Sequence, residues 1–454
     1  MMIPTNKCSL AISLALITTA VSTQTCASGF ALIEYSGSGL GNAYAGGAAS
    51  AEDASTIMFN PAGMSLIEGQ QLVGVLHYIH PTASFNNQNS SSPATPGGAP
   101  LMGPGSDGGR DAYVPNLYYV QTINNQTKFG LGINTPFGLA TQYDDNWVGR
   151  YHAVESDVLT ININPSISYQ VNDAWSFGAG FNVQYIHVIL SSAVDFGAIC
   201  YGALGAGACT SLGVAPQQTD GFAKLTGDDI SYGWNLGALY KLSDHTRLGV
   251  AYRSEITQDV TGNADFTVPG AAAFATANGA FVDTGLKSTV TLPGSLSASA
   301  YHNYDDKLAI MVDVTWTGWS KFQELRIVYD NANQPDSVTT ESWNNTLRYA
   351  LGINYRIDEQ LLFRAGMAYD ETPLPIAERR TPRIPDNNRT WLSFGTQYKL
   401  DSHFIVDVGY SHLFVSKPEV NNTFESSVPT LRATLQGNYD ASVDILSAQV
   451  TWNF

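Results

Sequence analysis

Apolar and polar residues alternate with a period of two along most of this chain. From Leu308 to Trp316 every second residue is a large apolar one, and from Ile161 to Gln170 isoleucine alternates mainly with asparagine and serine. Successive side chains of a strand point to opposite faces, so this pattern predicts β-strands with one apolar face. Similar runs occur at 175–185, 234–242, 248–252, 349–355, 361–369, 392–398 and 404–410.

The connections between these runs alternate between short and long. Short polar turns are predicted at 122–127, 172–173, 243–246, 303–306, 358–360 and 401–402. Long loops are predicted at roughly 81–112, 138–157, 193–229, 261–288, 317–344, 371–389 and 416–442. Short turns on one side and long loops on the other are typical of outer-membrane barrels. We therefore predict an all-β fold, a transmembrane antiparallel β-barrel of about 14 strands with both chain ends in the periplasm. A soluble two-sheet sandwich, the alternative, would not require this alternation.

The end of the chain has the same alternation with an aromatic last residue. Leu446, Ala448, Val450, Trp452 and Phe454 share one face. An aromatic carboxy-terminal residue on a lipid-facing stripe resembles the assembly signal of outer-membrane barrels, so Phe454 is the expected contact for the barrel-assembly machinery. A soluble strand with such a face would expose a flat apolar edge and aggregate.

The composition agrees with a membrane barrel. Only 13% of the residues are charged and 44% are hydrophobic, whereas soluble domains carry about 25% charged residues. No run after residue 20 approaches the ~20 apolar residues of a membrane helix. The net charge of −17 argues against nucleic acid or an anionic surface as a partner.

The first residues have the pattern of a signal peptide, predicted to span 1–27. Lys7 lies in a short basic region, an apolar stretch follows, and Thr25-Cys26-Ala27 is a plausible cleavage site. An anchoring helix is the alternative, but the apolar core is too short for one.

The next segment differs from both its neighbours. Residues 29–64 are rich in Gly, Ala and Ser, alternate poorly, and contain neither Lys nor Arg. A small-residue segment placed ahead of a closed barrel suggests a plug in the lumen. We therefore expect a hatch at residues 28–69 and the barrel at residues 70–454.

Two cysteines remain after the leader is removed. Cys200 and Cys209 lie in the loop sequence CYGALGAGAC. A pair of cysteines in an exported chain favours a disulfide, and two free thiols are the alternative. The spacing suits no metal site, and the sequence indicates no cofactor.

Several longer stretches resemble the FadL/TodX family of outer-membrane transporters for long-chain fatty acids and other hydrophobic compounds. These stretches are SGLGNAYAGGAASAEDAST, NPAGM, WSFGAGFNVQY, TGWSKFQEL and RIPDNNRTWLSFGTQY. The resemblance spans essentially the whole mature chain. It implies a barrel with an amino-terminal hatch in the bacterial outer membrane, surrounded by lipid and lipopolysaccharide. The implied ligand is a hydrophobic small molecule, and the expected state is a monomer.

The resemblance also implies which residues gate the lumen. Asn60-Pro61-Ala62 would form a turn of the hatch, since proline fixes φ and favours tight turns, whereas an ordinary turn before the first strand is the alternative. Movement near Phe30 would release the ligand.

The stretch LGINTPFGLAT matches the place where the family's third strand kinks inward and opens a hole in the wall. Asn134, Pro136, Phe137 and Gly138 are the residues concerned. Proline and glycine inside a strand mark a bulge, a kink or a strand end. A lateral opening is expected here, and the outer end of an ordinary strand is the alternative.

Two groups of residues are candidates for ligand binding. The family carries a basic residue at the position of Arg326, and a guanidinium pairs well with a carboxylate. Strict alternation would make Arg326 lipid-facing unless Gly318 shifts the register, and a solvated loop arginine is the alternative. A second basic residue of some relatives falls near Ser191 and Ser192, and neither is basic.

The loop at 261–288 holds the second candidate group, the aromatic residues of an apolar run. Phe266, Phe274 and Phe281 are expected to form a capture groove for hydrophobic substrate, and packing between loops is the alternative.

The sequence therefore predicts uptake of long-chain fatty acids or similar molecules, by loop capture, binding in the lumen and lateral release gated by the hatch. A TodX-like channel for aromatic hydrocarbons and a structural or adhesive barrel with a sealed lumen are the alternatives. No enzyme is expected, since His77, His152, His187 and His302 are scattered without a nucleophile motif.

Overall fold

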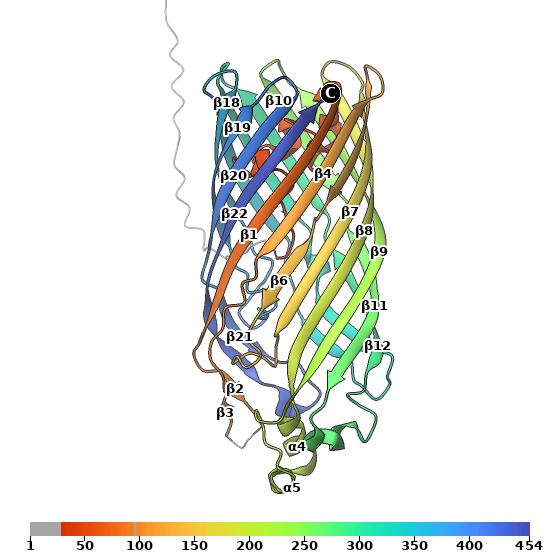
Figure 1. The fold of residues 1–454 in the computed structure, drawn as a ribbon, viewed down its shortest axis with the longest axis vertical. Coiled ribbons are helices and arrows are strands. Elements are labelled where there is room, and N and C mark those ends of the chain that lie inside the picture. The colour runs from red at the N-terminus through yellow and green to blue at the C-terminus, as the bar shows by residue number, and fades with distance from the viewer. Residues whose placement is uncertain (1–28, 95–96) are drawn as a thin grey trace, which may run out of the picture.

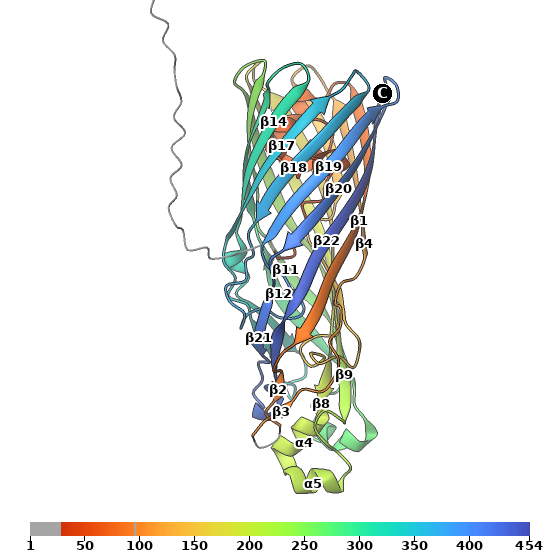
Figure 2. The same cartoon turned by 90° about the vertical axis from the view of Figure 1, so that its left-hand side faces the viewer.

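The structure is a computed structural model that describes residues 29–94 and 97–454. The predicted signal peptide, residues 1–27, lies outside the described residues. Long tilted strands close into a barrel with short turns at one end and loops and short helices at the other (Figures 1 and 2). Among the described residues, no helix has the length and apolar character needed to cross a membrane.

The barrel is closed by the pairing of the first strand with the last. Its segments are β1 (Gln70–Asn87), β2 (Ser91–Ser92), β3 (Ala99–Pro100), β4 (Ala112–Thr122), β5 (Thr127–Asn134), β6 (Gly138–Gln142), β7 (Glu155–Gln170), β8 (Trp175–Asp195), β9 (Asp220–Lys241), β10 (Thr246–Arg253), β11 (Ile256–Thr267), β12 (Thr284–Leu292), β13 (Ser295–Asn303), β14 (Leu308–Thr317), β15 (Glu324–Tyr329), β16 (Ser337–Thr340), β17 (Thr346–Arg356), β18 (Leu361–Asp370), β19 (Arg389–Lys399), β20 (Phe404–Val415), β21 (Glu419–Thr423) and β22 (Thr434–Asn453). All pairings are antiparallel, and β1 pairs with β22. Some wall strands consist of two segments in succession, so the barrel has 14 strands and the predicted count is confirmed.

The helices are short and lie in two places. They are α1 (Gly37–Leu40), α2 (Gly47–Ser50), α3 (Thr56–Phe59), η1 (Pro61–Leu66), α4 (Phe196–Leu204), α5 (Ala206–Ser211), η2 (Gly270–Thr276), η3 (Trp319–Lys321) and η4 (Pro429–Leu431). The first four belong to residues 29–69, here called the inner segment, which packs against the inner face of the wall strands. The longest, α4, projects with α5 beyond the loop end of the barrel (Figure 1).

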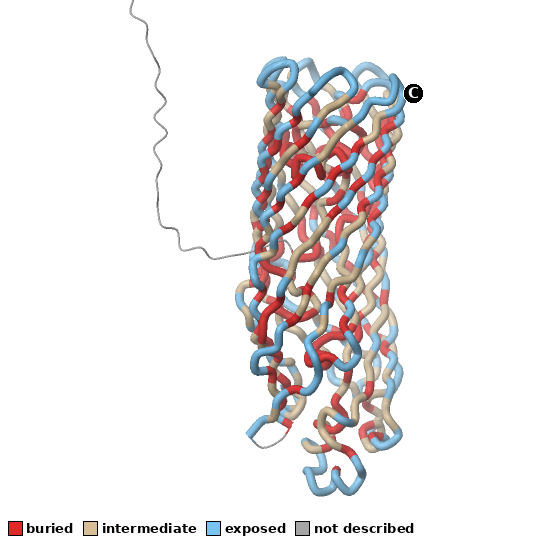
Figure 3. Tube along the Cα trace, turned by 60° about the vertical axis from the view of Figure 1, so that its left-hand side comes forward, coloured by how far each residue is buried: buried red, intermediate tan, exposed pale blue. Residues whose placement is uncertain are grey.

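The predicted alternation is present in the wall. In β14, Val312, Val314 and Trp316 are exposed while Met311 and Asp313 are buried. Exposed and buried residues alternate in the same way along the other wall strands (Figure 3). The exposed side chains include many large apolar ones, as a lipid-facing surface requires.

The strands extend further toward the loop end than the sequence predicted. The predicted loops at 193–229 and 261–288 are too long, because β9 begins at Asp220 and β11 runs to Thr267. A membrane crossing needs only about 9–11 residues per strand, whereas β8 has 21 and β9 has 22. Beyond the membrane both faces of a strand meet water, so the apolar alternation that identifies a strand disappears there.

The carboxy terminus lies at the short-turn end of the barrel (Figure 1). Phe454 exchanges backbone hydrogen bonds with Gln70 at 3.0 and 3.2 Å, which fixes the end of the last strand to the start of the first. The predicted periplasmic position of the other terminus concerns residues outside the described part of the chain.

Glycines in the wall allow the inner segment to approach the barrel closely. A Cβ added to Gly366 in β18 would lie 2.2 Å from the backbone oxygen of Asn42, and one added to Gly395 in β19 would lie 2.7 Å from the Cα of Gly41. Both distances are far below a van der Waals contact. These two wall positions therefore accept the inner segment only because they carry no side chain.

We expect Gly366→Ala to displace the inner segment and to lower the stability of the folded protein by about 1–3 kcal/mol, as overpacking does. The measurement is the thermal transition of the purified protein, followed by the change in gel mobility on unfolding. Gly74→Ala is the matched control, because nothing lies within 4 Å of a Cβ at that strand position. Equal transition temperatures for the two variants would contradict tight docking at Gly366.

Candidate ligand-binding cavity and gate

Four neighbouring wall strands are interrupted at the same level. The interruptions lie at 254–255, 293–294, 318–323 and 341–345. Their common level follows from the register, in which Arg253 pairs with Ser295, Ser295 with Thr317, and Thr317 with Thr346. Pro293 is the first residue of one of these breaks, and proline cannot donate to a strand ladder. At this level the chain leaves the wall and turns side chains into the lumen.

Five aromatic residues meet inside the barrel at this level, and we call them the gate cluster. Phe30 comes from the inner segment, Phe137 from the stretch between β5 and β6, and Trp319, Phe322 and Trp343 from the wall interruptions. Each is at most 8% exposed. The ring centroids of Phe30 and Trp319 are 4.9 Å apart, and those of Phe322 and Trp343 are 4.8 Å apart. These are favourable edge-to-face distances.

The third wall strand is interrupted between β5 and β6. Strand β4 pairs with β5 only as far as Leu117 opposite Ile133. At residues 136–138 the inner segment supplies the backbone partner, because Leu32 N donates to Pro136 O at 2.9 Å and Gly138 N donates to Phe30 O at 3.0 Å. The wall is thus interrupted at the residues singled out in the sequence, and the inner segment closes its edge.

A cavity of about 210 Å³ lies on the loop side of the gate cluster, and we call it the outer cavity. Its apolar side includes Leu190, Phe266, Leu325 and Ile327. Leu325 also packs against the gate cluster, so cluster and cavity are in direct contact.

Glu341 and Arg383 are two of the ionisable residues that line the outer cavity, and Arg383 is the one arginine among the described lining residues. Glu341 is 3% exposed, and its Oε2 accepts the indole N–H of Trp343 at 2.9 Å. Arg383 donates from Nη1 to the Ser156 hydroxyl at 2.9 Å and to the Glu155 carbonyl at 3.1 Å. Burial raises the pKa of Glu341 to about 8 and lowers the pKa of Arg383 to about 10, while the attraction between the two groups opposes both shifts.

A second cavity of about 150 Å³, the inner cavity, lies on the other side of the gate cluster. Its lining includes Leu32 and Glu34 of the inner segment, Phe137 of the gate cluster, and Arg348 and Trp391 of the wall. The gate cluster therefore stands between two cavities inside the same barrel.

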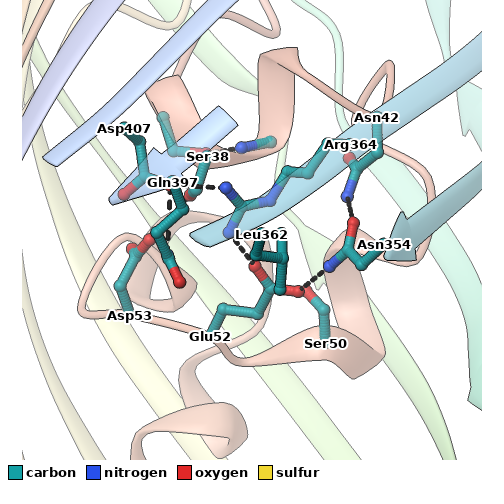
Figure 4. A network of polar contacts seen from close by, with 12 residues as sticks. Ser38, Asn42, Ser50, Glu52, Asp53, Asn354, Leu362, Arg364, Gln397 and Asp407 are labelled. Atoms are coloured by element: carbon teal, nitrogen blue, oxygen red, sulfur yellow. Dashed lines mark hydrogen bonds and ion pairs between the residues drawn. The ribbon is translucent and has the colours of Figure 1, made fainter. Parts of the chain in front are cut away.

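A buried ionic network fixes the inner segment on the short-turn side (Figure 4). Arg364 in β18 donates to Asp407 in β20 and to Glu52 of the inner segment, the latter at 2.8 Å. Glu52 also accepts from Asn354, and Asn354 accepts from Asn42 at 3.2 Å. The Arg364 side chain is 2% exposed. A buried guanidinium held by two carboxylates ties this part of the inner segment to the wall.

In the structure, Arg326 lies outside the lining of the outer cavity. Its side chain is 44% exposed and pairs with Glu324 at 2.7 Å and Asp336 at 3.2 Å. Its neighbours Leu325 and Ile327 line the outer cavity, so Arg326 points away from it. Strict alternation within β15 places it there, since the break at Gly318 does not shift its register toward the lumen.

The basic residue in the cavity, Arg383, was not identified from the sequence as a candidate. It is the first residue of the stretch RIPDNNRTWLSFGTQY, which carries part of the family resemblance. That stretch was the only sequence signal pointing to Arg383. Arg383 lies in a loop, where no alternation of apolar and polar residues predicts whether a side chain points into the lumen.

The three loop phenylalanines separate into two groups. Phe266 and Phe281 line the outer cavity. Phe274 packs with Phe196 of α4 and beside the disulfide that joins Cys200 to Cys209. Phe274 therefore takes part in packing between loops.

Asn60-Pro61-Ala62 lies at the start of η1, inside the barrel. The Asn60 side chain caps this helix by accepting from Ala62 N at 3.0 Å, and Pro61 is its first residue. The same side chain donates to Ala238 O of β9 at 3.0 Å. This turn is thus fixed to the wall.

We expect Arg364→Gln to loosen the inner segment, because Asp407 and Glu52 lose their shared cation and a broken buried pair costs about 3–5 kcal/mol. The measurement is ion conductance in planar bilayers, where the variant should give frequent openings. Arg356→Gln, at an exposed position of β17, is the control and should remain closed. An Arg364→Gln variant that shows no more openings than the wild type would show that the ionic network around Arg364 does not hold the inner segment in place.

The chain is similar in sequence to a family of outer-membrane proteins. Residues 18–454 match the family described as "Outer membrane protein transport protein (OMPP1/FadL/TodX)". The chain is 33% identical over 435 residues to the long-chain fatty acid transport protein of Escherichia coli strain K12, covering 92% of this chain and 93% of that protein. It is 31% identical to outer membrane protein P1 of Haemophilus influenzae, over 94% and 95% of the two chains.

The fold is also similar to solved structures. A Pseudomonas aeruginosa FadL homologue has a TM-score of 0.84 at 26% identity, covering 94% of this chain and all of that one. The Pseudomonas putida toluene transporter TodX has a TM-score of 0.65 at 20% identity, over 88% and 94% of the chains, and this second likeness concerns the fold alone.

Proposed function

The chain belongs to the OMPP1/FadL/TodX family of outer membrane transport proteins, and from this premise we propose that it takes up long-chain fatty acids through the outer membrane. It is an outer-membrane transporter for hydrophobic substrates and not an enzyme. The observation that carries the choice of fatty acids is the outer cavity, in which an apolar lining meets one arginine, Arg383.

The outer cavity suits a ligand with a long tail and an anionic head. The tail would lie against Leu190, Phe266 and Leu325, where each buried CH₂ contributes about 0.8 kcal/mol. The head would pair with Arg383, since a guanidinium forms strong charge-assisted hydrogen bonds with a carboxylate. Phe281, near the loops, is a capture residue in this proposal.

Release would require only the beginning of the inner segment to move. Residues 37–64 are docked on wall glycines and held by Arg364. Phe30 to Leu32 instead take part in the aromatic contacts of the gate cluster and in two backbone hydrogen bonds to residues 136–138. The inner segment is the hatch in this proposal, and its first residues are the moving part.

The exit would be lateral. Displacement of Phe30 to Leu32 joins the outer cavity to the inner cavity, which is lined by Pro136 and Phe137 at the interrupted third strand. A hydrophobic molecule gains free energy by leaving through the wall into lipid rather than through water.

The carboxy-terminal residue remains the proposed contact for the barrel-assembly machinery. Phe454 is 49% exposed and its ring lies 4.5 Å from that of Trp452. This accessible aromatic pair supports the proposal. A monomer embedded in lipid and lipopolysaccharide is proposed with it.

Two other functions remain to be distinguished. A channel for aromatic hydrocarbons is favoured by the largely apolar outer cavity, because such ligands need no cation. A sealed structural barrel would keep the gate cluster closed. Uptake of labelled oleate and of toluene by deletion and complemented cells separates all three, and equal uptake in both strains would exclude both transport functions.

We expect Arg383→Leu to weaken oleate binding by about 1.5–3 kcal/mol, roughly 10- to 100-fold, because a charged hydrogen bond is lost. Toluene uptake should be unaffected. The measurement is a binding titration with the purified protein. Arg326→Ala is the control and should bind as the unmodified protein does; unchanged oleate affinity in Arg383→Leu would contradict the assignment of the head-group site.

We expect a disulfide between Ala31→Cys and Phe137→Cys to stop oleate uptake without preventing oleate binding. The two residues face each other in an antiparallel bridge, which suits disulfide geometry. Reduction should restore uptake to the level of the single variants. Wild-type cells treated with the same reductant control for loss of the native disulfide, and unimpaired uptake by the oxidised double variant would exclude movement of this edge.

A further inference from the structure

Glu341 is a buried carboxyl group in the outer cavity with an unused oxygen. It follows β16 directly, is 3% exposed, and its Oε2 accepts the indole N–H of Trp343. Within residues 29–94 and 97–454, no group donates a hydrogen bond to its Oε1. Oε1 can therefore take part in a hydrogen bond with a ligand in the outer cavity, as an acceptor when ionised or as a donor when protonated.

The surroundings of Glu341 favour its uncharged form. Burial is the main cause that raises its pKa to about 8. The charge of Glu425 acts in the same direction, while the hydrogen bond from Trp343 and the charges of Arg383 and Arg379 oppose the shift. At neutral pH the group is therefore mainly a carboxylic acid with a proton to donate. The other titratable side chains that line the cavity are Tyr151, His152, Asp195, Tyr329 and Asp336. Burial lowers the pKa of His152 to about 4, so it stays uncharged from pH 6 upward.

Arg383 and Glu341 line the same cavity and are electrostatically coupled. Arg383 already donates to Ser156 and to two backbone carbonyls, so it is fixed in place. An anion bound to Arg383 in the outer cavity would therefore feel the charge state of Glu341. A carboxylic acid would donate a hydrogen bond to that anion, whereas a carboxylate would repel it.

We propose that Glu341 is the second contact for the ligand's head group and binds it as an uncharged acid that donates a hydrogen bond. This inference rests on the proposed function, because it concerns the head-group end of the same outer cavity. It assigns the cavity to acidic amphiphiles, carboxylates and sulfonates, held between one guanidinium and one carboxylic acid.

The same carboxyl group also holds a member of the gate cluster. Trp343 donates to Glu341 and packs against Phe30 with ring centroids 5.9 Å apart. A head group bound to Glu341 would therefore be linked to Phe30 through Trp343, which is hydrogen-bonded to Glu341 and packs against the Phe30 ring. In this arrangement the Glu341 side chain contacts both the bound head group and the gate cluster.

The test uses hexadecanesulfonate, which stays ionised over the whole pH range, so that only the protein titrates. Its dissociation constant is measured with the purified full-length mature protein in detergent between about pH 6 and pH 9. We expect constant affinity up to about pH 7 and roughly tenfold weaker binding at about pH 9, where Glu341 is mostly ionised. Hexadecanol, which has no charge, should bind without this dependence.

Glu341→Gln separates this assignment from a general effect of pH. Its amide N–H donates at every pH and its carbonyl can still accept from Trp343, so it should bind the sulfonate with the neutral-pH affinity throughout. Glu425→Gln is the matched control, because Glu425 also lines the cavity but is exposed and paired with Arg379 at 3.1 Å. That variant should keep a pH dependence, with its midpoint moved slightly to lower pH because the charge of Glu425 contributes to the raised pKa of Glu341.

The outcomes distinguish the inference from the proposed function. A pH-independent wild-type affinity, a pH dependence retained in Glu341→Gln, or an equal dependence for hexadecanol would each overturn the role of Glu341 and leave fatty-acid uptake standing. Wild-type protein that binds neither oleate nor the sulfonate at any pH would instead refute the proposed function. If Glu341→Gln does not fold, the comparison of sulfonate with hexadecanol in the wild type decides alone.

Discussion

The requirement that every backbone N–H and C=O within a membrane find a partner inside the protein governs this structure. A barrel satisfies it by closing β1 onto β22. An interruption of the wall leaves a free edge, and at residues 136–138 the inner segment closes that edge through Leu32 N and Phe30 O. The weak point in the wall and the segment that seals it are therefore parts of one hydrogen-bonded unit. The proposed lateral release would therefore need no strand to unpair from its neighbours in the wall.

The inner segment is held in two different ways along its length. Residues 37–64 are fixed by contacts that tolerate little displacement, namely glycine contacts such as those at Gly366 and the buried guanidinium of Arg364. Around Phe30 the contacts are between aromatic rings, which can slide and repack at modest cost. Two of the four wall interruptions supply three of those rings. The aromatic residues that leave the wall at these two interruptions therefore form the gate cluster with Phe30 and Phe137.

The strand count and the orientation of the strand faces could be predicted because lipid imposes a strict rule on every second side chain. That rule gives Val312, Val314 and Trp316 in β14 their outward direction, and the structure has them there. It fails beyond the membrane, which is why the extension of β8 and β9 was missed. It also gives Arg326 an outward direction, as the structure has it, whereas the ligand role expected for Arg326 came from the family resemblance. Arg383 and Glu341 lie in aperiodic connections, so only the folded chain brings them to one cavity.

The length of β8 and β9 bears on where a substrate first meets the protein. Strands of 21 and 22 residues, at about 3.3 Å per residue, are more than twice as long as a bilayer crossing requires. The surplus stands on the loop side as a raised rim, and α4 and α5, joined by the disulfide, project beyond it (Figure 1). In the lipopolysaccharide surroundings proposed for this protein, a hydrated sugar layer would lie above the lipid. A rim that rises through such a layer would carry the apolar entrance outward, so a substrate would not have to dissolve in it.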